Sequence, residues 1–117
     1  MVARDLTKGY EAEFLQADLN RFATYPNEFP ILARYDIVLA LAVAHKLEEP
    51  EDFLRAAAGR SNKWLVFRAP FKTADWPHFR RDNRLIDTIA ILSGRGFTLD
   101  HEAPGPRDEW TGIFRRT

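Results

Sequence analysis

Cysteine is absent from this chain of 117 residues. Its absence excludes disulfide bonds and thiolate metal sites, and with them the class of small secreted proteins whose folds depend on disulfides. The three histidines, His45, His78 and His101, show none of the spacings that metal-binding histidines adopt in sequence. The sequence therefore predicts no metal site.

Long hydrophobic runs are absent too. No apolar stretch approaches the ~20 residues that a helix needs to span a bilayer. Residues 1–8 also lack the apolar core of a signal peptide. We therefore expect a cytoplasmic protein that has no membrane partner.

An excess of charge of either sign is lacking, because 17 lysines and arginines balance 17 aspartates and glutamates. No overall field would attract nucleic acid or anionic lipid. Trp76, His78, Phe79 and Arg80 do combine aromatic rings with cations, as single-stranded nucleic-acid sites do. We interpret that segment as a solvated lid, and we expect no nucleic-acid partner.

Glycine is scarce, with six residues at positions 9, 59, 94, 96, 105 and 112. None of them forms a glycine-rich loop after a predicted strand, so the phosphate-binding loops of the P-loop and dinucleotide types are missing. The single Gly-x-Gly, Gly94-Arg95-Gly96, follows a predicted helix, and we interpret it as the end of that helix. Ser61 and Ser93 lie in no nucleophile elbow, so hydrolase chemistry has no support either.

What the sequence does contain is a strand, helix and strand pattern over residues 35–70. Ile37–Leu41 is an unbroken apolar run with β-branched residues, which predicts a parallel strand that is buried on both faces. Pro50 suits the first helical position and Gly59 the helix end. Trp64–Phe67 predicts a second buried strand. The pattern indicates one right-handed βαβ unit, with ligand-binding positions past the carboxyl ends of its strands.

The segments before this unit are less regular. We expect one domain over residues 1–117, in which residues 1–12 form a polar N-terminal segment and residues 13–117 form the sheet and helices. Glu13–Leu19 is a candidate strand that carries an acidic residue near its end. Asn20–Arg34 is expected to be irregular, because its prolines prevent a long helix.

After the unit, the sequence predicts a loop over Ala69–Asn83. Asp82 or Asn83 could cap a following helix, and its apolar face would be Leu85, Ile86, Ile89, Ala90 and Leu92. Phe97–Glu102 alternates as a half-buried strand does, and Glu109–Arg115 is a final strand after a Pro-Gly turn. The chain is therefore expected to close with an antiparallel pair.

In this order the elements resemble the second half of the class I S-adenosylmethionine-dependent methyltransferases. Phe14-Leu15-Gln16-Ala17-Asp18-Leu19 looks like the third strand of that family, with its terminal acidic residue. Tyr35-Asp36-Ile37-Val38-Leu39-Ala40 looks like its fourth strand, and Leu65-Val66-Phe67-Arg68 like its fifth. Ala42-Val43-Ala44-His45-Lys46-Leu47 resembles the segment after the fourth strand. Gly96-Phe97, followed by the Pro-Gly turn, resembles the final reversed pair.

The resemblance implies an α/β fold. It would be a partial Rossmann-like sheet of the class I methyltransferase type, mostly parallel, with a C-terminal antiparallel β-hairpin. It also implies S-adenosyl-L-methionine as cofactor. In the family, the residues matching Asp18 and Leu19 bind the adenine, through the carboxylate and a backbone N–H respectively. The backbone at Ala40 and Leu41 would line the methionine side.

The same resemblance places His45 near the substrate, where it could act as a general base. Arg68, Trp76 and His78 would belong to the substrate loop, in which Arg68 could hold an acidic group. Each residue also has a structural interpretation. Asp18 could cap a turn, His45 could be a hydrogen-bonded histidine at a helix start, and Arg68 could be a surface ion-pair partner.

The chain departs from the family pattern before Phe14, where a complete member has a strand, a glycine-rich loop and a second strand with an acidic end. This departure implies a fragment or subunit that needs the missing glycine-rich half for methyl transfer, and we expect the isolated chain to be inactive. The edge of the strand at residues 37–41 would then be unpaired. The strand at Phe14, a second copy of the chain or a second polypeptide could cover it. The alternative function is a non-catalytic binding or regulatory module that retains the methyltransferase fold.

Overall fold

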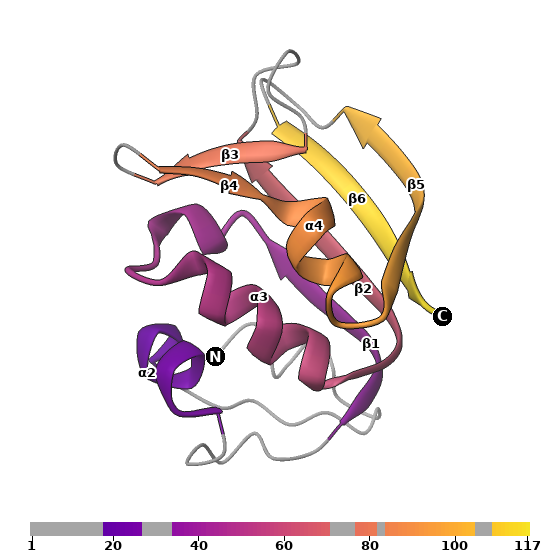
Figure 1. The fold of residues 1–117 in the computed structure, drawn as a ribbon, viewed down its shortest axis with the longest axis horizontal. Helices are drawn as coiled ribbons and strands as arrows, with labels where there is room; N and C mark the ends of the chain where they lie inside the picture. The colour runs from indigo at the N-terminus through magenta and orange to yellow at the C-terminus, as the bar shows by residue number, and fades with distance from the viewer. Residues whose placement is uncertain (1–17, 27–33, 71–76, 82–83, 105–108) are drawn as a thin grey trace, which may run out of the picture.

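The structure is a computed structural model that describes residues 18–26, 34–70, 77–81, 84–104 and 109–117. Four strands form one sheet, two short strands form a separate hairpin, and helices connect them (Figure 1). In chain order the elements are α2 (Leu19–Thr24), β1 (Tyr35–Leu41), the 3₁₀-helix η2 (Ala44–Lys46), α3 (Pro50–Gly59), β2 (Ser61–Pro70), β3 (His78–Arg81), β4 (Arg84–Asp87), α4 (Thr88–Ser93), β5 (Phe97–Pro104) and β6 (Glu109–Arg116).

The main sheet has the strand order β1-β2-β6-β5. β1 and β2 are parallel, with Ile37 opposite Trp64 and Leu41 opposite Arg68. β6 is antiparallel to β2 and to β5. Three of the four strands therefore run in one direction and only β6 is reversed. The predicted βαβ unit and the predicted C-terminal antiparallel pair are both confirmed, and the fold is mixed α/β.

Helix α3 forms the crossover between the two parallel strands, as its sequence predicts. Pro50 stands in its first turn beside Glu51 and Asp52, whose negative charge favours a helix N-terminus. Phe53 and Leu54 are buried on the side that faces the sheet. The helix includes Gly59, and Arg60 is its C-terminal capping residue.

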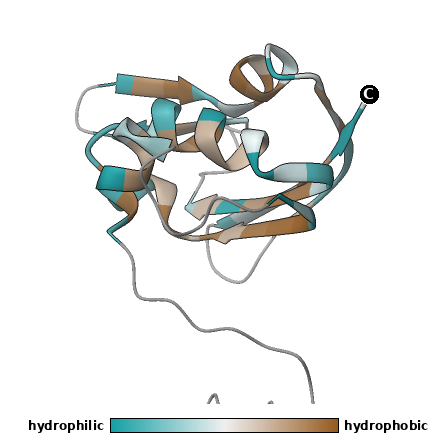
Figure 2. Cartoon of the chain, turned by 90° about the horizontal axis from the view of Figure 1, so that it is seen from below, coloured by the Kyte–Doolittle hydropathy of each residue, from teal (hydrophilic) through white to brown (hydrophobic). Residues whose placement is uncertain are grey.

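One face of the sheet is packed against the helices, and the core lies between the two layers. Leu65, Phe67 and Phe114 project from the central strands and are completely buried there, together with Leu54 and Leu92 of the helices. In Figure 2 the helices gather on one side of the sheet, and no helix of the described ranges covers the other side. Among the described residues, this second face of the sheet is therefore uncovered, and we call it the open face.

Strand β1 corrects one sequence prediction. It was expected to be buried on both faces, but Ile37 is 57% exposed, Leu39 is 63% exposed and Leu41 is 40% exposed. These three side chains point to the open face, whereas Val38 and Ala40 point to the helices and are partly or fully buried. The apolar composition of β1 therefore reflects burial on one face, while its other face and its outer edge are uncovered in the described structure.

The segment around Asp18 and Leu19 is a second correction. Asp18 precedes helix α2 as its N-cap, and Leu19 is the first helical residue, so neither belongs to a strand. The rest of the predicted strand, residues 13–17, lies outside the described residues. The following residues were expected to be irregular, yet they form the helix Leu19–Thr24. A short helix is favoured here because the Asp18 side chain satisfies an otherwise free N–H of the first turn.

The third correction concerns the loop that was predicted over Ala69–Asn83 and the helix that was predicted after it. Residues 78–81 form β3, and Leu85 and Ile86 lie in β4 rather than in a helix. The helix is shorter than expected, begins at Thr88 and is capped by the side chain of Asp87. Trp76 lies outside the described residues.

The β3–β4 hairpin is attached to the domain by one aromatic contact and by arginines. Phe79 is 1% exposed, and its ring lies 5.8 Å from that of Phe67. Arg81 Nε donates a hydrogen bond to the carbonyl oxygen of Leu47 at 2.6 Å, and Arg84 binds Glu51 at 3.1 Å. The hairpin is therefore part of the core rather than a solvated lid.

Candidate functional site

An apolar groove of about 490 Å³ runs along the outer edge of β1. Its walls come from β1 and from the helices α2 and α3. Three of the four residues predicted to bind a cofactor, Leu19, Ala40 and Leu41, line it together. Phe22 and Phe53 supply its aromatic surface, with ring centroids 6.2 Å apart. The groove can therefore receive an apolar or aromatic group beside the end of β1.

Hydrogen bonds fix the start of α2 near the carboxyl end of β1. Asp18 Oδ1 accepts a hydrogen bond from the backbone N–H of Asn20 at 3.0 Å, which caps the helix. The side-chain oxygen of Asn20 accepts one from the backbone N–H of Glu48 at 2.9 Å, just after η2. Asp18 is exposed and adjacent in sequence to Leu19 of the groove. The arrangement leaves a carboxylate available to solvent beside an apolar wall.

The turn after β1 has an unusual backbone. Ala42 has a φ of 59°, and among the residues that the structure describes it is the only non-glycine residue in the left-handed region. Its N–H donates to the carbonyl oxygen of Arg68 in β2 at 2.8 Å. Such conformations concentrate where a chain must approach a ligand or turn sharply. The backbone between Ala40 and Val43 is therefore held in a defined shape at the carboxyl end of β1.

A polar cluster lies next to this turn, at the ends of β1 and β2. Arg68 Nε donates a hydrogen bond to Thr111 Oγ1 at 2.8 Å and lies 3.9 Å from Glu109 Oε2. The negative charge of Glu109 also acts on His45, in η2, where it favours the protonated imidazole and so acts to raise its pKa. The Glu109 carboxylate thus acts electrostatically on His45 and pairs with Arg68. The interpretation of Arg68 as an ion-pair partner agrees with this geometry.

Burial lowers the pKa of His45 below its ordinary value of 6.5, and the neighbouring charge of Lys46 lowers it further, while Glu109 acts in the opposite direction. Within the described ranges, Nδ1 of His45 is buried and has no hydrogen-bond partner. Because the pKa lies below 6.5, the imidazole is neutral near pH 7. A neutral imidazole can accept a proton from a bound molecule.

His78 does not join this cluster. It pairs across the β3–β4 hairpin with Asp87, and the His78 Nε2 to Asp87 Oδ2 distance is 3.3 Å. Glu109 and Thr111 do join the cluster but were missed by the sequence reasoning. Their positions follow from the register of β6 against β2, in which Thr111 is opposite Arg68. The polar residues at the start of the last strand were the one signal that could have indicated them.

No group of three or more metal-binding side chains occurs within the described part of the chain. A helix long and apolar enough to cross a membrane is likewise not found among those residues.

Comparison with known proteins gives matches only at the level of structure. No family model and no curated protein matches the sequence. Magnesium protoporphyrin IX methyltransferase (ChlM) from Synechocystis PCC 6803 with bound SAH aligns with a TM-score of 0.71 at 18% identity, over 97% of this chain and 55% of that one. The same enzyme with bound SAM aligns with a TM-score of 0.63 at 19% identity, over 97% of this chain and 50% of that one. The chain has a class I methyltransferase fold.

A second enzyme supports this methyltransferase fold. The N-methyltransferase NodS from Bradyrhizobium japonicum WM9, in complex with S-adenosyl-L-homocysteine, aligns with a TM-score of 0.65 at 16% identity, over 97% of this chain and 59% of that one. The chain therefore spans little more than half the length of these structures. The resemblance in fold that the sequence indicated is confirmed.

Proposed function

We propose that the chain is a part of an S-adenosylmethionine-dependent methyltransferase and supplies the adenine side and the substrate side of its site. The observation that carries this proposal is the groove in which Leu19, Ala40 and Leu41 meet at the end of β1, in a methyltransferase fold. In open α/β sheets, ligands bind past the carboxyl ends of the strands, and one end of this groove, at Ala40, Leu41 and Val43, lies there.

The residues present fit the adenine end of the cofactor. A carboxylate only accepts hydrogen bonds, so Asp18 could accept one from the exocyclic amine, while the backbone N–H of Leu19 offers the opposite polarity. Asp18 is exposed and already held in place as the N-cap of α2. The apolar wall beside Leu19 matches the flat face of a base. The backbone of Ala40 and Leu41 would lie along the methionine part.

The substrate side would be the cluster of His45, Arg68 and Glu109. When bound, the cofactor would supply an activated methyl group, so the protein's main task is to hold the acceptor in line with it. Neutral His45 could take the acceptor's proton through Nε2, since Nδ1 is buried. Arg68 is engaged by Thr111 and Glu109, and these contacts position it rather than leave it ready for an acidic substrate.

The proposal includes a partner. The outer edge of β1 and the open face of the sheet carry Ile37, Leu39 and Leu41, each at least 40% exposed. Parallel sheets are normally covered on both faces, and an unpaired apolar edge invites a further strand. We propose that a second polypeptide carrying the glycine-rich half of the partial Rossmann-like sheet pairs with β1. Methyl transfer would then depend on the assembled pair, and the isolated chain would be inactive.

A titration followed by nuclear magnetic resonance tests the cofactor proposal. Adenosine at millimolar concentration should shift the amide signals of Asp18 and Leu19, and S-adenosylhomocysteine should additionally shift those of Ala40 to Ala42. Asp18→Ser keeps a capping side chain but removes the carboxylate, so it should lower the affinity of the chain for both ligands. Asp87→Ser makes the same change at the cap of α4 and should leave binding unchanged. If neither ligand shifts these signals, the cofactor proposal is wrong.

Coexpression with the products of neighbouring genes tests the partner proposal. Leu39→Glu places a charge on the exposed side of β1 and should abolish a complex with the second polypeptide. Leu85→Glu makes the same change at a residue of the β3–β4 hairpin that is 48% exposed, and it should leave the complex intact. Sedimentation of the chain alone should give a monomer. A homodimer that Leu39→Glu dissociates would contradict the second-polypeptide proposal.

The second candidate function is a non-catalytic binding module with the same fold. The apolar edge of β1, which no described strand covers, favours it, because partner binding through this edge requires no cofactor. A complex that forms without any uptake of S-adenosylhomocysteine would support this candidate over the enzyme.

A further inference from the structure

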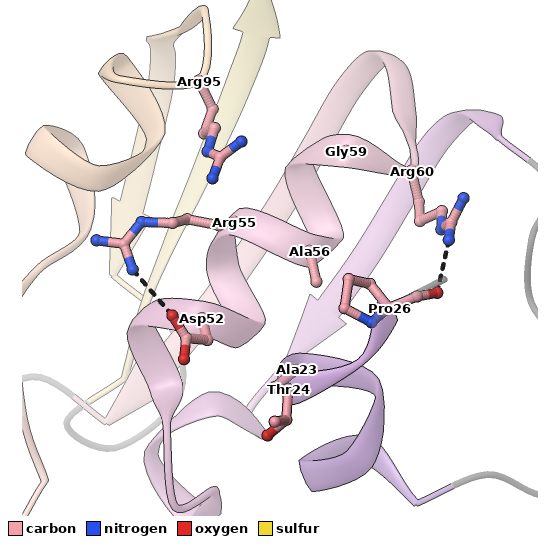
Figure 3. A pocket seen from close by; sticks show the side chains of 9 residues that line it. All are labelled: Ala23, Thr24, Pro26, Asp52, Arg55, Ala56, Gly59, Arg60 and Arg95. Carbon is pink, nitrogen blue, oxygen red and sulfur yellow. Dashed lines mark hydrogen bonds and ion pairs between the residues drawn. The ribbon is translucent and has the colours of Figure 1, made fainter. Parts of the chain in front are cut away.

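A second hollow, of about 370 Å³, lies between α3, the end of α2 and the turn after α4 (Figure 3). Its charged residues are Asp52, Arg55, Arg60 and Arg95, and we call it the arginine pocket. Three guanidinium groups and one carboxylate leave it with an excess of two positive charges. This local excess contrasts with the zero net charge of the whole chain.

The arginine pocket is at the opposite end of the sheet from the proposed methyltransferase site. Arg60 immediately precedes β2, and Arg95 precedes β5, so both lie at the amino-terminal ends of strands. Ala40, Leu41 and Arg68, which are proposed for methyl transfer, lie near the carboxyl ends of β1 and β2. Arg60 also lines the far end of the β1 groove, beside Tyr35. The arginine pocket therefore needs an explanation of its own.

The three arginines differ in how far they are engaged. Arg55 Nη1 lies 3.1 Å from Asp52 Oδ1, and Arg60 Nη2 donates to the carbonyl oxygen of Pro26 at 2.7 Å (Figure 3). The side chain of Arg95 forms no hydrogen bond or ion pair with the residues that the structure describes, whereas its backbone N–H donates to the carbonyl oxygen of Leu92 at 3.0 Å. Its guanidinium points toward α3 in the view of Figure 3. Within the described ranges, the pocket therefore contains the guanidinium of Arg95 without a partner beside those of Arg55 and Arg60, which protein contacts hold in place.

The surface between these arginines leaves room for a ligand. Ala56, which is 8% exposed, and the exposed Gly59 line the pocket from α3, and a Cβ atom added at Gly59 would meet nothing within 4 Å. A ligand could thus approach the backbone of the last turn of α3. The hollow falls within the size range of sites for small molecules, which begins at about 300 Å³.

We propose that the arginine pocket binds a small ligand that carries a phosphate or diphosphate group. Guanidinium groups match the geometry of phosphate oxygens with paired N–H donors. A dianionic phosphate would neutralise the excess of two charges, whereas a single carboxylate would neutralise half of it. The limited volume and the absence of net charge on the chain favour a small ligand over a nucleic acid strand.

Titration of the ¹⁵N-labelled chain with pyrophosphate, at constant ionic strength, tests this proposal. We expect saturable shifts of the Nε–Hε signals of Arg55 and Arg95 and of the Gly59 amide. Arg95→Ala should weaken the affinity at least about tenfold, because a charge-assisted contact is lost. Gly59→Glu, which places a carboxylate in open space, should abolish binding. Shifts that do not saturate would overturn the proposal.

Arg115→Ala is the matched control. Arg115 is an exposed arginine of β6 that pairs with Asp100 at 3.6 Å and lies outside the arginine pocket. We expect this variant to bind pyrophosphate as the unmodified chain does. An equal loss of affinity in Arg115→Ala and Arg95→Ala would mean attraction to charge in general and would overturn the proposal. S-adenosylhomocysteine should not compete with pyrophosphate for binding. The pyrophosphate titration therefore tests the arginine pocket even if the methyltransferase proposal is wrong.

Discussion

The backbone N–H of Ala42 donates a hydrogen bond to the carbonyl oxygen of Arg68 at 2.8 Å, and this bond holds Ala42 in the left-handed conformation, with a φ of 59°. The parallel pair β1–β2 is thereby extended by one residue beyond Leu41, into the turn that leads to His45. The sheet itself therefore fixes the shape of the chain where the proposed cofactor groove and the polar cluster meet.

The conformation of Ala42 predicts a stabilising substitution. Ala42→Gly removes the steric cost of the left-handed region but adds chain entropy to the unfolded state. We expect a net gain of about 0.5–1 kcal/mol in the free energy of unfolding, measured by urea denaturation. Ala90→Gly, at an exposed position inside α4, should instead lose about 1 kcal/mol. A loss of stability in Ala42→Gly would show that the strain is absent.

Phe79 provides a test of the hairpin's place in the core. Because Phe79 is 1% exposed and contacts Phe67, Phe79→Ala should reduce the free energy of unfolding by about 3–5 kcal/mol. Arg80→Ala, at the exposed neighbouring position, should change it by less than about 0.5 kcal/mol. Similar small effects of both substitutions in thermal and urea denaturation would mean that the hairpin is not packed against the sheet.

The lowered pKa of His45 predicts how stability depends on pH. In the unfolded chain this histidine has its ordinary pKa of 6.5, and in the folded chain the pKa is lower. Between the two values the unfolded state binds more protons, so stability falls as the pH drops through this window and recovers as the pH rises above it. Urea midpoints measured on both sides of 6.5 should reveal the fall.

His45→Gln should remove that part of the pH dependence. His101→Gln, at an exposed position of β5, should retain it. If the two variants show the same pH profile, another group is responsible for the fall in stability.

Arg116 joins the end of α3 to the sheet. Its Nη2 donates to the carbonyl oxygens of Ala58 at 3.0 Å and Ser61 at 2.7 Å, and its guanidinium lies 4.7 Å from the ring centroid of Phe97. Lysine keeps the charge but lacks the planar fork of donors. We expect Arg116→Lys to lower the free energy of unfolding by about 2 kcal/mol.

Arg115→Lys, at the exposed neighbouring residue, is the control for Arg116→Lys. It should have almost no effect, because an exposed ion pair contributes about 0–1 kcal/mol. Equal melting temperatures for the two variants would argue against the role of Arg116 in joining α3 to the sheet.

The sequence predicted the parts of the fold that are specified locally. Pro50 and the apolar positions of α3 defined the crossover helix, and alternation in residues 97–102 and 109–115 defined the closing pair. The exposure of Ile37 and Leu39 could not be predicted, because an apolar run has the same composition whether one face or two are covered. The hairpin was missed because a strand of four residues is too short to show a clear alternation of apolar and polar side chains. Phe79 is surrounded in sequence by cationic residues, so its burial could not be predicted.

The candidate site was predictable to a similar degree. Leu19, Ala40 and Leu41 line one groove, in which Ala40 and Leu41 come from a strand that the sequence predicts and Leu19 comes from α2, which it does not. Asp18 was expected at the end of a strand but caps α2, because a capping aspartate and a strand-end aspartate cannot be distinguished in sequence. Glu109 and Thr111 could not be predicted, since their proximity to Arg68 depends on the register of β6, which is set by pairing between distant segments.

The position of β6 also affects how the domain can be synthesised. It is the last strand in sequence, yet it lies between β2 and β5. On the ribosome, β5 has no partner in the sheet until residues 109–116 emerge, and β2, although it can already pair with β1, has one uncovered edge until that moment. Completion of the sheet should therefore be a late event, and the interval before it would be the time at which the chain is most prone to aggregation.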